Sequence, residues 1–294
     1  MYKIGIDLGG TKIEGIILEE NGKEIFRKRI ATEQEKGYNH ILSNIKSLYC
    51  NLTEEIKKQP HTLGIGTPGA LSIRTGLLKN SNTTCLNGKP LKKDLEIMLA
   101  HQIDIQNDAN CFAMAEAALG AGKGKDLVFG VIMGTGCGGG IVYHGKVITG
   151  LQAITGEWGH MSIDPSGPEC YCGSRGCVET FISGGGLEKQ WQKKYGKKET
   201  LKNIVKLFRN GDNNASEFMA EFFRHFGRAM ANLINILDPD IVVLGGGVSN
   251  IEELYTLGIE EVRRCVFSDS LETPIVKHTL GDSAGVIGAA MIGI

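Results

Sequence analysis

Hydrophobic positions along this chain fall into short apolar runs that end in glycine and longer stretches with apolar residues at helical spacing. The apolar runs at 61–71, 104–108 and 240–250 predict strands. Helical spacing predicts a helix over 109–122, mostly helical structure over 186–238 and a closing helix over 281–294. This succession of strand and helix patterns predicts an α/β fold.

The same local pattern occurs twice. Residues 4–17 read IGIDLGGTKIEGII and residues 129–142 read FGVIMGTGCGGGIV, each an apolar strand, a glycine turn and a second apolar strand. After a shift of 125 positions, Gly5, Gly9, Gly15 and Ile16 coincide with Gly130, Gly134, Gly140 and Ile141. A hairpin-type turn follows each copy, at 21–23 and at 144–146. The repeat predicts two related α/β halves.

Glycine turns indicate a nucleotide. The turn residues are Asp7, Gly9, Gly10, Thr11 and Lys12, then Gly134, Thr135 and Gly136, and finally Gly245, Gly246 and Gly247. Glycine lets backbone N–H groups approach phosphate oxygens, and Lys12 adds a positive charge. Asp7, at the end of a strand, suits a Mg²⁺ held through water. Tight hairpin turns without a ligand are the alternative, but their repetition in register favours a nucleotide held between the two halves.

A cysteine cluster indicates a metal. Cys170, Cys172 and Cys177 lie within eight positions, and His160 is ten residues upstream. Four nitrogen or sulfur ligands suit tetrahedral Zn²⁺, and a zinc with four protein ligands is structural. Free thiols and a disulfide are the alternatives, the latter disfavoured if the protein is cytoplasmic.

Composition narrows the class of partner. The chain has 294 residues, which allows two domains, with 41% apolar and 22% charged residues and a net charge of −1. This balance argues against nucleic acid or an acidic membrane surface as a partner. The N-terminus lacks a secretory pattern and the apolar stretches are too short to span a bilayer, so we expect a cytoplasmic protein.

Several motifs together resemble one family. DxGGTK at the start, LGGG late in the chain, GEWGH (156–160) and CYCGSRGCVE (170–179) resemble the ROK family of bacterial sugar kinases, within the sugar kinase, actin and Hsp70 superfamily. The resemblance implies two ribonuclease H-like, actin-like ATPase domains with an interdomain cleft. It implies residues 1–115, closed by the helix 282–294, as the first domain, and residues 116–281, with the zinc loop, as the second. It also implies ATP, Mg²⁺, a structural Zn²⁺ and a homodimer.

The resemblance further implies roles for particular residues. Asp108 would be the general base, and the sugar hydroxyl groups would be bound by Asn107, Asp108, Glu157, His160 and Glu179. From position alone, Asp108 or Asn110 could instead cap the following helix. Glu157 and Glu179 could likewise be solvated surface charges.

These features predict ATP-dependent phosphorylation of a free hexose at its C6 hydroxyl. Residues 79–95 most resemble bacterial fructokinases, so fructose comes first, and N-acetylglucosamine, mannose and glucose follow. Transcriptional repressors of the same family are the rival class, but they carry a winged helix before the first strand, and here three residues precede Ile4. A catalytically silent sugar-binding protein is the further alternative.

Overall fold

The computed structural model describes residues 1–293, which form two compact units. The first unit contains Met1–Gly124, Gly140–Thr155 and the chain from Thr279 onward, and the second contains Lys125–Gly139 and Gly156–His278. The predicted boundary between 115 and 116 falls inside helix α3 (Asp108–Leu119), which stays whole within the first unit. Residues 140–155 also group with the first unit rather than with the second.

The sheet of the first unit has the strand order β3-β2-β1-β4-β7. Its strands are β1 (Tyr2–Leu8), β2 (Lys12–Leu18), β3 (Glu24–Ala31), β4 (His61–Thr67) and β7 (Asp104–Asn107). The pairings β1–β2 and β2–β3 are antiparallel, whereas β1–β4 and β4–β7 are parallel. The unit also contains the hairpin β5 (Ala70–Leu71) and β6 (Leu78–Lys79) and the helices α1 (Tyr38–Glu55), α2 (Leu91–Leu99), α3 and α9 (Ala284–Ile292).

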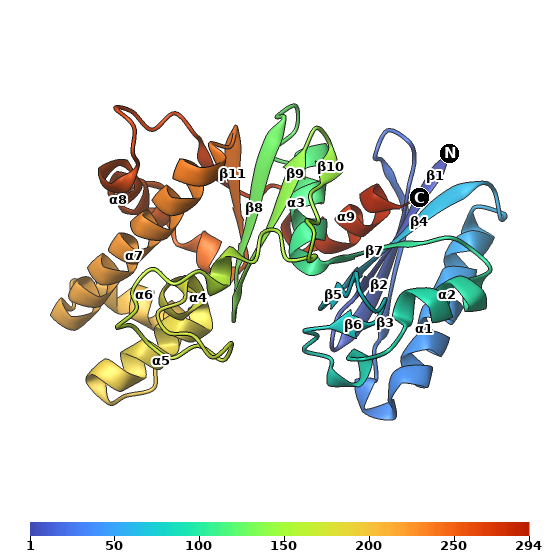
Figure 1. Ribbon diagram of the computed structural model, residues 1–294, viewed down its shortest axis with the longest axis horizontal. Coiled ribbons are helices and arrows are strands. Elements are labelled where there is room, and N and C mark those ends of the chain that lie inside the picture. Colours follow the sequence, from blue (N-terminus) through green and yellow to red (C-terminus); the bar gives the residue numbers. More distant parts are fainter. Residues whose placement is uncertain (294) are drawn as a thin grey trace. The chain divides into compact units, whose positions relative to one another are not determined.

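Helix α9 packs unusually close to the sheet because its neighbours are glycines. A Cβ added at Gly5 would lie 2.4 Å from the nitrogen of Ala290, and one at Gly64 would lie 2.0 Å from the carbonyl oxygen of Ala289. Figure 1 shows α9, in red, beside β1 and β4. The C-terminal segment therefore completes the first unit, and its helix begins next to the carboxyl end of β1.

The second sheet has the order β10-β9-β8-β11-β12. Its strands are β8 (Leu127–Met133), β9 (Cys137–Tyr143), β10 (Lys146–Val147), β11 (Ile241–Gly245) and β12 (Ile275–Lys277). The helices of the second unit are α4 (Val178–Ile182), α5 (Gly184–Tyr195), α6 (Leu201–Arg209), α7 (Asn213–Leu237) and α8 (Leu257–Cys265). Short 3₁₀ turns are η1 (Gln34–Lys36), η2 (Thr84–Leu86), η3 (Trp158–His160), η4 (Gly247–Asn250), η5 (Glu252–Tyr255) and η6 (Gly281–Ser283).

The repeat seen in the sequence is present in the backbone. A shift of 125 positions carries β1 onto β8 and β2 onto β9 at both ends of each strand. Both sheets place an antiparallel hairpin at one side and parallel strands at the other. His144 and Gly145, with φ of 48° and 72°, form the two-residue turn that joins β9 to β10. The prediction of two related halves is confirmed.

No helix among the described residues is long and apolar enough to cross a membrane. The buried apolar residues instead belong to the two sheets and to the helices packed on them, as in Ile4, Ile65, Val243 and Phe226.

Candidate functional site

The first glycine turn joins β1 to β2 in the first unit. The N–H of Gly9 donates to the carbonyl oxygen of Lys12 at 2.9 Å, which closes the turn. Thr32, fully buried, holds the turn from behind, because its hydroxyl donates to the Gly9 oxygen at 2.7 Å and its N–H donates to the Thr11 oxygen at 3.0 Å. Thr11 and Lys12 remain exposed and Gly10 half-buried, so the outer side of the turn is open to a ligand. No local motif in the sequence marks Thr32 for this role.

Asp7 and Asp108 form an acidic pair in the first unit. Burial raises the pKa of Asp7 to about 6, and the neighbouring carboxylates of Asp108 and Glu14 add to the effect, whereas Lys12 opposes it. Glycine makes room for the Asp7 carboxylate, since a Cβ at Gly285 would lie 2.9 Å from its Oδ2. The negative charge of Asp108 disfavours ionisation of Asp7, and a proton or a cation at the two carboxylates would relieve this repulsion.

The junction between β7 and α3 shows which residue caps the helix, a question that the sequence left open for Asp108 and Asn110. Asn107 is the helix cap, because its Oδ1 accepts the N–H of Asn110 at 2.8 Å. Asp108 is the first helical residue, and its Oδ1 accepts its neighbour's N–H, that of Ala109, at 2.8 Å. The reading of Asp108 or Asn110 as the cap is therefore wrong, and the cap does not require the Asp108 carboxylate.

The second and third glycine turns lie together in the second unit. Gly134 donates to the Gly136 oxygen at 2.9 Å, and the positive φ of 78° at Gly246 lets the third turn pass against Met133. A Cβ at Gly246 would lie 2.4 Å from the Met133 oxygen, so this position requires glycine. Gly245 itself is the last residue of β11 and is buried in the sheet.

Helix α5 begins directly beside the second turn. The N–H of Gly184 donates to the Gly134 oxygen at 2.8 Å, and Ser183 caps the helix by accepting the N–H of Gly186 at 2.9 Å. The N-terminus of this twelve-residue helix therefore faces the Gly134–Thr135 region, where its dipole favours an anion. A Ser-Gly-Gly-Gly run before a helical pattern was the sequence signal for this contribution, and it was not used.

A cavity of about 990 Å³ opens from these turns within the second unit. Gly134, Thr135 and Gly247 line one part of it. The rest is lined mainly by α5, α6 and η4, with Glu188, Leu201, Lys202, Asn203, Val205, Lys206, Arg209, Val248, Asn250 and Ile251. This mixture of apolar walls and amide and basic groups suits a nucleoside with its phosphates at the glycine turns. The α6 residues carried no recognisable motif in the sequence.

His160, Cys170, Cys172 and Cys177 come together in the second unit, with their ligand atoms all within 4.8 Å of one another. The Nδ1 of His160 lies 3.6 Å from the Sγ of Cys170, and the sulfurs of Cys172 and Cys177 lie 3.7 Å apart. Ligands on a tetrahedral zinc with Zn–S of about 2.3 Å are separated by about 3.5–3.8 Å. The residues therefore fit a tetrahedral metal site.

The backbone conformation of residues 170–177 lets three cysteines of this short segment point to one place. Gly173 and Gly176 have φ of 92° and 65°, and a Cβ at Gly176 would collide with the Asp164 oxygen. The backbone N–H of Ser174 lowers the pKa of Cys172 to about 6, and burial raises the pKa of Cys177 to about 12. The thiolate form of Cys172 is thus already favoured, and a bound cation would favour the thiolate form of Cys177 as well.

The predicted sugar-binding residues of the second unit flank this cluster. Trp158 is buried and donates its Nε1–H to the Gly138 oxygen at 3.2 Å, which anchors the GEWGH segment and leaves Glu157 exposed. Glu179, in the first turn of α4, accepts the N–H of Cys137 on its Oε2 at 2.9 Å. Reading Glu179 as a solvated surface charge is therefore wrong, because a backbone group holds it.

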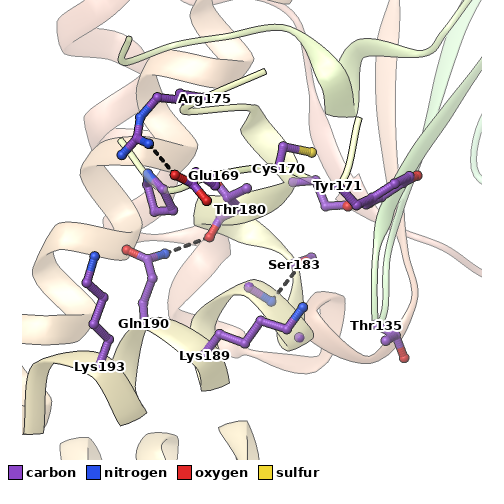
Figure 2. Close-up of a pocket in the computed structure, with 14 residues that line it drawn as sticks. Thr135, Glu169, Cys170, Tyr171, Arg175, Thr180, Ser183, Lys189, Gln190 and Lys193 are labelled. Carbon is purple, nitrogen blue, oxygen red and sulfur yellow. Dashed lines mark hydrogen bonds and ion pairs between the residues drawn. The ribbon is translucent and has the colours of Figure 1, made fainter. Parts of the chain in front are cut away.

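Tyr171 is a residue of this region that the sequence analysis missed. Its hydroxyl oxygen lies 3.1 Å from the Nε2 of His160, and the two rings meet edge to face with centroids 5.2 Å apart. Figure 2 shows Tyr171 next to Cys170 in a pocket that Thr135 and Lys189 also line. The pocket has a volume of about 460 Å³, and Glu179 is another of its lining residues. Its place between two predicted metal ligands was the available signal.

Comparison with known proteins agrees with this arrangement. The sequence profile of the ROK family matches residues 3–293, and the chain belongs to the ROK family. An N-acetyl-D-glucosamine kinase of Vibrio atlanticus is 35% identical over 300 residues, covering 99% of each chain. A ROK hexokinase from Thermus thermophilus has a TM-score of 0.91 and 31% identity, covering 100% of this chain and 98% of its own. A ROK family glucokinase from Streptomyces griseus, solved with glucose and AMPPNP, has a TM-score of 0.78 and 29% identity, covering 100% and 99%. The predicted family and its α/β sugar kinase fold are confirmed.

Proposed function

We propose that this protein is an ATP-dependent N-acetylglucosamine kinase that phosphorylates the C6 hydroxyl of the sugar. The observation that carries the proposal is the position of Asp108, which stands beside Asp7 while Asn107 caps the helix. Asp108 accepts the proton of the hydroxyl as the sugar oxygen attacks the γ-phosphorus, and the bond to the β-phosphate oxygen breaks to release ADP. Relatives named as hexose kinases support this enzyme class.

The nucleotide is proposed to bind in the 990 Å³ cavity of the second unit, with its phosphates at Gly134, Thr135 and the N-terminus of α5. The Streptomyces griseus relative was solved with an ATP analogue, which supports ATP as the donor. Lys12 would add positive charge at the phosphates. Asp7 would hold Mg²⁺ through water, and a divalent cation there would relieve the repulsion between Asp7 and Asp108.

The cluster of His160 and the three cysteines is proposed to hold a structural zinc. Four protein ligands leave no position for a reactive water, so the metal would stabilise the loop and take no part in the transfer. Its contribution would be to fix His160 and Glu179, two of the proposed sugar-binding residues. Asn107 and Glu157 complete that proposed set.

N-acetylglucosamine is placed ahead of fructose because the relatives with 33–36% identity are named as kinases of that sugar. The resemblance of residues 79–95 to fructokinases stays a prediction. In the structure, two polar residues of that segment bond to each other: Asn87 accepts the N–H of Ser81 and donates to its oxygen, both at 2.9 Å. The predicted homodimer and cytoplasmic location also stay predictions.

A coupled assay with ATP and Mg²⁺ tests the proposal across N-acetylglucosamine, glucose, mannose and fructose. We expect the highest kcat/KM with N-acetylglucosamine. Preference for another of these sugars would overturn the substrate assignment, and turnover of none of them would overturn the kinase assignment and favour a silent sugar-binding protein.

A further inference from the structure

The ring of His160 would keep one N–H group outside the cluster if a metal is bound to Nδ1, which lies beside the Sγ of Cys170. A metal on Nδ1 leaves the proton of a neutral imidazole on Nε2, and that N–H normally donates to an oxygen that orients the ring. Here the phenol oxygen of Tyr171 lies 3.1 Å from Nε2, within hydrogen-bond distance. With a metal on Nδ1, the Nε2–H of His160 would therefore donate to the Tyr171 oxygen.

The same N–H is the group that the proposed function assigns to a sugar hydroxyl. A single N–H makes one good hydrogen bond, so the phenol and a sugar hydroxyl exclude each other at His160. The Tyr171 phenol also lies in the region proposed for the sugar, because Tyr171 and Glu179, another proposed sugar-binding residue, line the same pocket.

Tyr171 has the freedom to give way. Its side chain is 83% exposed, and its contacts are with the His160 ring rather than with a surrounding core. The main chain around it is fixed by the cysteine loop, in which Cys170 and Gly173 close a turn at 3.0 Å. The side chain can therefore leave His160 by rotation while the loop keeps its shape.

We propose that Tyr171 is a further residue of the sugar site, whose hydroxyl competes with a sugar hydroxyl for the Nε2–H of His160 and so sets the affinity for the sugar. This inference depends on the proposed function, since it needs a sugar hydroxyl at His160. Only the molecules in which the phenol has left His160 can bind the sugar. The apparent dissociation constant is therefore the intrinsic constant divided by the fraction of these molecules.

Tyr171→Phe tests the proposal because it removes only the competing oxygen. We expect the dissociation constant for N-acetylglucosamine, measured by calorimetry without ATP, to fall about two- to tenfold, the ratio that corresponds to one net hydrogen bond. The KM for the sugar should fall in parallel, with kcat, the KM for ATP and the metal content unchanged. Tyr195→Phe is the matched control, since its hydroxyl bonds to the Asn214 oxygen at 3.0 Å on the same unit and should leave sugar affinity unchanged.

Other results for Tyr171→Phe would overturn the proposal. An unchanged or weaker sugar affinity in Tyr171→Phe overturns the competition, and so does loss of metal, which would make Tyr171 a support of the cluster. If the wild-type protein neither binds nor phosphorylates any of the four sugars, the proposed function fails and this inference fails with it. If the wild type is active and only the Tyr171→Phe result disagrees, the proposed function stands alone.

Discussion

The carboxylate of Glu179 accepts a hydrogen bond from the backbone N–H of Cys137, with 2.9 Å between Oε2 and the nitrogen. Glu179 directly follows the cysteine loop, and Cys137 directly follows the second glycine turn. A Cβ at Gly136 would lie 2.6 Å from the same carboxylate oxygen, so the turn and the carboxylate are packed against each other. A change in the cysteine loop should therefore affect the second glycine turn, the proposed phosphate site, as well as the proposed sugar-binding residues.

Removing one metal ligand tests this connection. In Cys177→Ser we expect the protein to lose its metal, from about one zinc per chain, because a hydroxyl is a poor substitute for a buried thiolate ligand. Structural zinc contributes on the order of 10 kcal/mol to folding in small zinc domains. The melting temperature should fall, and the KM values for both sugar and ATP should rise.

The exposed Cys265, in α8, provides the matched control for that experiment. Cys265→Ser should keep both the metal and the activity. Elemental analysis that finds no metal in wild-type protein prepared without chelators would contradict the zinc assignment.

The second glycine turn gives a test of the nucleotide site with little risk to the fold. A Cβ added at Gly134 would meet no described atom within 4 Å, and its φ is not in the left-handed region. Gly134→Val should therefore fold normally, while its branched side chain occupies the space assigned to phosphate. We expect a KM for ATP at least tenfold higher with the sugar dissociation constant unchanged. An unchanged KM for ATP would remove this turn from the nucleotide site.

Replacing Asp7, one member of the acidic pair, should raise stability and lower activity. Asp7 has a pKa of about 6 in the folded protein against 3.8 in an unfolded chain, so the folded protein holds this proton more tightly. The resulting contribution to stability is present below about pH 4 and is lost as the pH rises through about 6. Asp7→Asn should then raise the free energy of unfolding by up to about 3 kcal/mol at pH 7.5 without Mg²⁺, and by about half as much at pH 5.

The same substitution should nearly abolish kinase activity if Asp7 holds Mg²⁺ at the phosphates. Urea unfolding at the two pH values measures the first effect, and a coupled assay measures the second. A variant that is no more stable than wild type at pH 7.5, or that gains equally at both pH values, would contradict the shifted pKa of Asp7.

The sequence predicted the features that depend on local pattern. The two predicted copies of the strand, turn and strand pattern are both present, and their strands have the same bounds after a shift of 125 positions. This repeat was predictable because glycine and apolar spacing act within a few residues. The cysteine cluster was also predictable, because its three cysteines lie within eight positions and the glycines between them, Gly173 and Gly176, have positive φ.

Features that depend on contacts between distant parts of the chain could not be predicted from the sequence. Thr32 supports the first turn from another strand end, and α6 lines the cavity without any motif of its own. The two neighbouring candidates Asn107 and Asp108 show the limit most clearly. Both types of residue cap helices, and only the direction of the Asn107 side chain, set by where β7 ends, decides between them.

Asp108 is proposed to take the proton of the sugar hydroxyl, and the Asp108→Asn variant gives the sharpest test of that role. The variant keeps the size of the side chain and its ability to form hydrogen bonds, and the cap is unaffected because Asn107 provides it. We predict a folded, metal-containing protein that binds the sugar with unchanged affinity and has a kcat lower by about 10²–10⁴. A kcat within a few-fold of wild type would contradict the account and leave Asp108 without a role in proton transfer.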